Sequence, residues 1–256
     1  MKKHKKSLLF ICADQWRFDC FSFLKHQHAL TPNLDKLAKQ SVVFRKHFAG
    51  IVPCGPSRTT MLTGLYPFIH RSVFNGAPLD KRFTNIAKEV RKLNYNHIFV
   101  LPFLKDNGLQ LNNIQDGLEK LAIPFKENTD IIRRVSNAGK NYLDRGTTLL
   151  HGDYYPGSWM ERNNNIYIID PEFTFLGSKE FDLGVMSGHL ILATGQISYL
   201  KKICDNYPDK IDNNEVAIYC AIEIIRRLIG YAQLPIKRSI NEKSNLLKLS
   251  KELIIN

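Results

Sequence analysis

The chain has 256 residues, 44% of them apolar and 23% charged, with a formal net charge of +12; it can bury one large core or two small ones. Its five cysteines form no C-x-x-C pair, and no stretch approaches the roughly 20 apolar residues of a membrane span. This excludes a zinc cluster, a disulfide framework and a membrane-spanning protein, and it indicates a protein of the reducing cytoplasm. Aromatic and basic residues are not interleaved, which argues against a nucleic-acid partner.

The first 100 residues predict an α/β arrangement. Ser7–Ala13 is a short apolar run, typical of a buried parallel strand, and it leads into Asp14 and Gln15. After Lys2–Lys6 the same run imitates a short signal peptide, but its length is at the lower limit, so a buried strand explains it better. Thr31–Ala38 begins a helix with a threonine cap and a proline at the first position. The further predicted elements are an extended segment over Val42–Phe48, helices over Pro56–Leu62 and Arg82–Leu93, and a strand over Tyr95–Val100.

The composition changes near residue 100. Residues 1–100 contain 17 Lys and Arg against five Asp and Glu, whereas residues 101–256 contain 19 of each. The excess of positive charge reflects either a lysine-rich surface or attraction for anionic substrates. The change in charge composition near residue 100 predicts two domains, 1–100 and 101–256. The second domain is predicted to be mainly helical, with a catalytic loop and a short hairpin through Asn163-Asn164-Asn165 inside Thr147–Ile169. Its predicted helices cover Leu111–Phe125, Asp130–Leu143, Glu180–Ala193, Glu215–Ile229 and Asn241–Ile254.

Five ordered blocks in the N-terminal domain carry a family resemblance. They are Ala13-Asp14-Gln15-Trp16-Arg17, Thr31-Pro32-Asn33-Leu34-Asp35, Pro53-Cys54-Gly55-Pro56-Ser57-Arg58, Thr63-Gly64-Leu65-Tyr66 and Arg71–Leu79. From about residue 8 to 97 the chain resembles type I sulfatases, in the arylsulfatase and phosphonate monoester hydrolase branch of the alkaline phosphatase superfamily. The resemblance implies parallel strands with helices and a hydrolase of sulfuric or phosphonic esters.

The resemblance also implies the roles of individual residues. Cys54, oxidised to formylglycine by a separate formylglycine-generating enzyme, would be the nucleophile, and Arg58 would steady its hydrate. Asp14 and Gln15 would bind a divalent metal, Ca, Mg or Mn, and Asn75 would face the anionic ester substrate. A cysteine at a helix start suits a tetrahedral anion, because unpaired N–H groups face the ligand. An isolated cysteine would instead be read as an ordinary thiol, but the ordered blocks favour the sulfatase reading.

A second set of ordered blocks follows residue 104. It comprises Asp106-Asn107-Gly108-Leu109, Leu149–Ser158, Ile168-Ile169-Asp170-Pro171-Glu172-Phe173 and Glu180-Phe181-Asp182-Leu183-Gly184. From about 104 to 256 the chain resembles the kinase-like C-lobe of the aminoglycoside phosphotransferase superfamily, in the branch of methylthioribose kinase.

This resemblance implies phosphotransfer from ATP to an alcohol. Asp153 would orient the acceptor hydroxyl and take its proton, while Asp170 and Glu172 would bind Mg²⁺. Three residues would support the catalytic loop: His151, Ser158 and Asp182. For His151 and Asp182 a structural role is preferred over direct chemistry, whereas the Ser158 hydroxyl, which stands where many relatives have Asn, could still coordinate Mg²⁺.

Each family is represented by only part of its machinery. The sulfatase metal site lacks its expected downstream ligands, and no G-x-G-x-x-G loop or strand lysine of a kinase precedes residue 104. We therefore expect a composite of a truncated sulfatase and a truncated small-molecule kinase, as a gene fusion would produce, with both activities weak or lost. Three alternatives remain open: residual sulfatase activity through Cys54, residual phosphotransferase activity through Asp153, and a non-catalytic module that binds small molecules. Apolar surface left exposed by the truncations would favour self-association.

Overall fold

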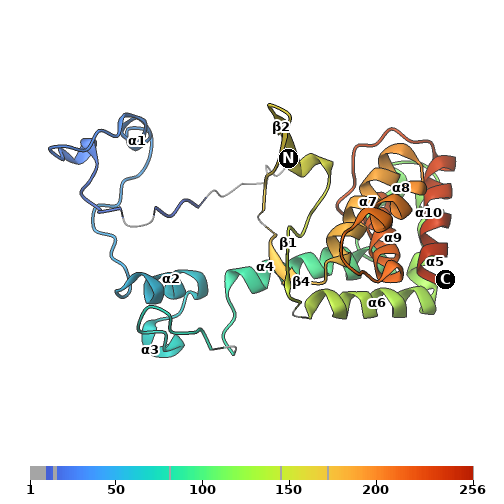
Figure 1. The fold of residues 1–256 in the computed structure, drawn as a ribbon, viewed down its shortest axis with the longest axis horizontal. Coiled ribbons are helices and arrows are strands. Elements are labelled where there is room, and N and C mark those ends of the chain that lie inside the picture. The colour runs from blue at the N-terminus through green and yellow to red at the C-terminus, as the bar shows by residue number, and fades with distance from the viewer. Residues whose placement is uncertain (1–9, 14–15, 81, 145, 172, 256) are drawn as a thin grey trace. The chain divides into compact units, whose positions relative to one another are not determined.

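The computed structural model describes residues 10–13, 16–80, 82–144, 146–171 and 173–255. The chain divides into two compact units, Met1–Thr60 with Tyr66–Pro78, and Met61–Leu65 with Leu79–Asn256. The described part of the chain is largely helical, with small two-stranded sheets (Figure 1). None of the described helices combines the length and the apolar character needed to cross a membrane. The predicted family boundary near residue 100 stays a prediction.

Short helices joined by irregular segments form the first unit. As predicted, α1 (Pro32–Ala38) begins with proline. Thr31 stands at the predicted cap position, but its side chain makes no capping hydrogen bond: the hydroxyl accepts the N–H of Ser22 (3.0 Å) and donates to Asp35 Oδ1 (2.9 Å). The helix predicted around Pro56 is confirmed as α2 (Cys54–Thr63), and α3 (Pro67–His70) follows it.

The strand predicted at Ser7–Ala13 is not found in the part of the chain that the structure describes. Residues 7–9 lie outside the described residues, and residues 10–13 are exposed and irregular. Val42–Phe48 is also exposed and pairs with no described strand. A strand needs a neighbouring strand to pair with its backbone N–H and C=O groups. The described residues of the first unit contain no strand. The predicted α/β arrangement is therefore absent from these residues.

The strand predicted at Tyr95–Val100 is wrong. The chain leaves α4 (Ile86–Tyr95) through a π-helical turn, Asn96–Val100, and a 3₁₀ turn, Leu101–Phe103. Ile98 and Phe99 are buried in the core of the second unit. An apolar run can be buried equally well by helices or by a sheet, and here helices surround it.

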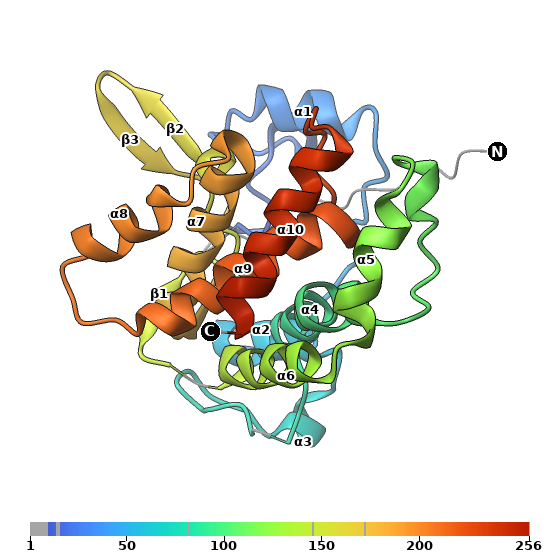
Figure 2. The same cartoon turned by 90° about the vertical axis from the view of Figure 1, so that its right-hand side faces the viewer.

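The described residues of the second unit contain six further helices, and α9 packs against both α7 and α10 (Figure 2). The helices predicted from Asp130 onward are confirmed, and α8 is an additional helix that no pattern predicted. The helix predicted over Leu111–Phe125 begins only at Leu118, because Gly117 before it has φ +81°. Gly184 permits the close packing, since a Cβ there would lie 2.4 Å from Tyr219 Cβ. The helices are α5 (Leu118–Glu127), α6 (Thr129–Leu143), α7 (Glu180–Thr194), α8 (Ser198–Asn206), α9 (Asn213–Ile229) and α10 (Ile240–Ile255).

Two antiparallel strand pairs lie beside this core. β1 (Thr148–Leu150) pairs with β4 (Phe175–Gly177), and β2 (Trp159–Arg162) pairs with β3 (Asn165–Ile168). The second pair is the predicted hairpin, and its turn residues Asn163 and Asn164 have φ of +53° and +60°. Asparagine tolerates this left-handed conformation, which matches the twist of the two strands.

Candidate functional site

The loop after β1 carries His151, Gly152 and Asp153, and α7 holds it in place. Asp182 on α7 accepts hydrogen bonds from the backbone N–H groups of His151 (2.6 Å) and Gly152 (3.0 Å). Burial raises the pKa of the Asp182 carboxyl, and the two amide hydrogen bonds only partly offset that effect. The side chain therefore fixes the backbone just before Asp153.

His151 and Ser158 also bond within this loop. His151 Nε2 donates to the carbonyl of Ile169 (2.9 Å), which leaves Nδ1 to accept the N–H of Asp153 (3.4 Å). The Ser158 hydroxyl, itself buried, donates to the carbonyl oxygen of Asp153 (3.0 Å). The three residues predicted to support the loop all bond to its backbone.

Two arginines of α9, which sequence reasoning missed, meet Asp153. The Nη2 atoms of Arg226 and Arg227 lie 3.2 Å and 3.1 Å from Asp153 Oδ1. Both guanidinium groups also contact Glu223, which is 1% exposed. Arg227 Nε donates to Glu223 Oε1 at 2.7 Å. The available signal was the run Ile224-Ile225-Arg226-Arg227-Leu228, in which two charges interrupt an apolar helix.

The same cluster contains a group that could hold a metal. His189 Nε2 lies 2.9 Å from Glu223 Oε1, and ligand atoms of Asp153, His189 and Glu223 all lie within 4.8 Å of one another. The two carboxylates are already paired with two guanidinium cations, which would repel a divalent ion. As arranged, the carboxylates are engaged in ion pairs, which disfavours a divalent metal at these residues.

Among the described residues, no hydrogen bond or ion pair joins Asp170, a predicted kinase-type metal ligand, to this cluster. Asp170 follows β3 in the left-handed conformation (φ +66°) and is exposed. Glu172 lies outside the described residues.

A cavity of about 320 Å³ opens beside the arginines. Asp153 and the two arginines form one wall, and Phe173 lies beside them. The opposite lining comes from the segment that follows α4 and from its last turns: Leu93, Asn94, His97 and Ile98.

In the first unit, the structure brings Cys54 and Asn75 together. Cys54 is exposed at the start of α2, and its Sγ lies 3.5 Å from Asn75 Oδ1, which also accepts the N–H of Gly55 (2.8 Å). Arg58 is one turn further along α2. Asp14 and Gln15 lie outside the described residues, so the predicted metal site stays a prediction.

The site residues thus fall into two classes: a cysteine at a helix start, and an acidic loop that faces arginines on a helical core. Comparison with known proteins finds similarity to two families. Residues 6–121 match the Sulfatase family model. The chain is 42% identical over 97 residues to the multifunctional alkaline phosphatase superfamily protein PehA of Trinickia caryophylli, covering 36% of this chain and 19% of that protein.

The C-terminal part is similar to methylthioribose kinases. Identity is 33% over 96 residues with the enzyme of Exiguobacterium sibiricum, covering 38% of this chain and 24% of the kinase. With the enzyme of Bacillus velezensis it is 30% over 114 residues, covering 44% of this chain and 28% of the kinase. The chain therefore spans less than a third of the length of each of these relatives. Both predicted resemblances are confirmed.

Proposed function

We propose that the chain is a composite of a truncated sulfatase and a kinase-like C-lobe, with both activities weak or lost, and that its remaining property is to bind a small anionic molecule at Arg226 and Arg227. The observation that carries the proposal is the pairing of both guanidinium groups with Asp153 Oδ1. A carboxylate in that contact is poorly placed to receive the proton of an acceptor alcohol.

The arginines offer the N–H donors that an anion needs. Two guanidinium groups face two carboxylates, and of these Glu223 is buried whereas the Asp153 side chain is 25% exposed. An incoming phosphate or sulfate could replace Asp153 at the arginines, because their fork of N–H donors matches such oxyanions. Mg²⁺ and ATP would enter only in the alternative of residual phosphotransfer through Asp153, with Asp170 and Glu172 as metal ligands.

Calorimetric titration with inorganic phosphate and with MgATP tests this function. We expect phosphate to bind the wild-type chain and to bind Arg227→Gln much more weakly. Arg133→Gln is the matched control, because Arg133 lies exposed on α6. If the pure protein phosphorylated a sugar or an amino alcohol from MgATP at enzyme-like rates, the proposal would be wrong.

A second candidate is hydrolysis of a sulfate or phosphonate ester through Cys54. It is favoured by the exposure of the thiol beside Asn75 at a helix start. In this candidate the protein is cytoplasmic, and a formylglycine-generating enzyme would convert Cys54 to formylglycine. Asp14 and Gln15 would bind a divalent metal. The mass of the peptide that contains Cys54 distinguishes thiol from aldehyde. Cys54→Ala should abolish turnover of an aryl sulfate, and unchanged turnover would end this candidate.

Self-association is the third element of the proposal. The first unit exposes large apolar side chains, among them Phe18, Phe48 and Phe68, and such surface favours association. Light scattering after size-exclusion chromatography measures the mass, and a highly soluble monomer would contradict this element.

A further inference from the structure

The helix α4, which lies in the sulfatase-like segment, is fixed onto the kinase-like helices. The Arg91 guanidinium lies over the Phe175 ring, 4.4 Å from its centroid, and donates to the backbone carbonyls of Tyr142 and Asp144, the latter at 3.1 Å. Gly139 on α6 leaves room for this segment, because a Cβ there would lie 2.8 Å from the Tyr95 ring. The sulfatase-like segment therefore forms a wall of the second unit.

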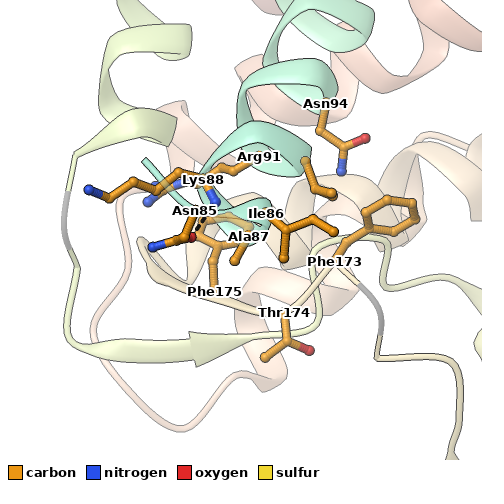
Figure 3. A pocket seen from close by; sticks show the side chains of 10 residues that line it. Asn85, Ile86, Ala87, Lys88, Arg91, Asn94, Phe173, Thr174 and Phe175 are labelled. Atoms are coloured by element: carbon orange, nitrogen blue, oxygen red, sulfur yellow. Dashed lines mark hydrogen bonds between the residues drawn. The ribbon is translucent and has the colours of Figure 1, made fainter. Parts of the chain in front are cut away.

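That wall encloses a second cavity, of about 560 Å³ (Figure 3). Its lining is mostly apolar, with Ile86 and Val90 from α4 and with Phe173 and Phe175 from the segment around β4. Polar side chains complete the lining, among them Asn85, Asn94 and the two cations Lys88 and Arg91 (Figure 3).

The two cavities adjoin. Asn94 and Phe173 line both of them. Arg226, Arg227 and Asp153 line one cavity, whereas the lining of the other is mostly apolar and includes two phenylalanine residues, Phe173 and Phe175. A molecule that filled both would place a negative group at one end and a flat apolar group at the other.

We propose that these cavities form one binding site for an aromatic anion, such as an aryl phosphate, whose ring packs between α4 and Phe173 while its oxyanion binds Arg226 and Arg227. This inference rests on the proposed anion-binding function and adds the apolar half of the ligand. It also assigns a role to the sulfatase-like segment: α4 lines the apolar half of the site and carries Lys88 and Arg91 there, whereas Asp153, Arg226 and Arg227 come from the kinase-like part.

Calorimetric titrations with inorganic phosphate and with phenyl phosphate test the site. Because burying part of a phenyl ring corresponds to about a tenfold gain in affinity, phenyl phosphate should bind the wild-type chain at least about tenfold more tightly than phosphate. Ile86→Trp should remove this preference by filling the apolar cavity, while the affinity for phosphate remains. Ile86 is 61% exposed, so the larger side chain need not disturb the core.

The matched control is Ile123→Trp, on α5 at a position that lines neither cavity. It should keep the preference for phenyl phosphate. Equal affinity of the wild-type chain for the two compounds overturns the inference and leaves the anion site intact. If neither compound binds, the proposed function fails as well. Because the first comparison uses the wild-type chain alone, the test does not depend on whether a variant folds.

Discussion

Replacing Glu223 by glutamine should destabilise the second unit strongly. The carboxylate is 1% exposed, contacts Arg226, Arg227 and His189, and balances two guanidinium groups whose side chains are 9% and 11% exposed. Removing one partner of a buried ion pair costs about 3–5 kcal/mol, and in Glu223→Gln the two guanidinium groups keep only the partly exposed Asp153 as a counter-charge. At about 2–4 °C per kcal/mol for a unit of 150–250 residues, the melting temperature should fall by about 6–20 °C.

The pH dependence has a definite sign. Burial opposes ionisation, but the attraction of Arg226 and Arg227 and the contact with His189 outweigh it, so the pKa of Glu223 is held well below its usual range. A depressed pKa contributes stability that is fully present above the unfolded-state value of about 4.3 and is lost as the pH falls through the folded-state pKa. Acid should therefore reduce the difference between the wild type and Glu223→Gln.

Urea unfolding followed by far-UV circular dichroism, at neutral and at acidic pH, measures both effects. Glu242→Gln is the control, because Glu242 pairs with Arg238 while its side chain is 51% exposed, and its stability should change little. If Glu223→Gln were as stable as this control at neutral pH, the buried ion cluster would not contribute as argued.

Three further substitutions test single contacts. Asp182→Asn cannot accept both amide hydrogen bonds, so its free energy of unfolding should fall by about 1–3 kcal/mol in urea titrations; unchanged stability would contradict the bracing of the loop. Gly139→Ala places a Cβ 2.8 Å from the Tyr95 ring and should cost about 1–3 kcal/mol by overpacking in the same titration, whereas a gain in stability would refute this packing. Asn75→Ala removes the side chain that contacts the Cys54 thiol, so alkylation of Cys54, followed by mass spectrometry, should become faster. An unchanged rate would argue against that contact.

Local patterns in the sequence predicted the helices of the second unit well. Apolar residues at helical spacing predicted α6, α7, α9 and α10, and an asparagine pair predicted the turn between β2 and β3. These features depend on residues close together in the chain, whose spacing and conformational preferences can be read directly. The ordered blocks likewise carried both family resemblances.

The strand predicted at Tyr95–Val100 failed because an apolar run specifies burial but not the element that buries it. Its surroundings are α6 and α9, which follow it by tens of residues in the chain.

The sequence by itself determined the two ancestries, most of the helices and the loop that carries Asp153. Only the tertiary structure decided what Asp153 faces, because Arg226 and Arg227 are more than 70 residues away and enter the site when α9 packs against α7. It also decided that α4 of the sulfatase-like segment lines a cavity beside them. A site is a set of distances between side chains, and distances between residues far apart in the chain are set by packing, which no local pattern records.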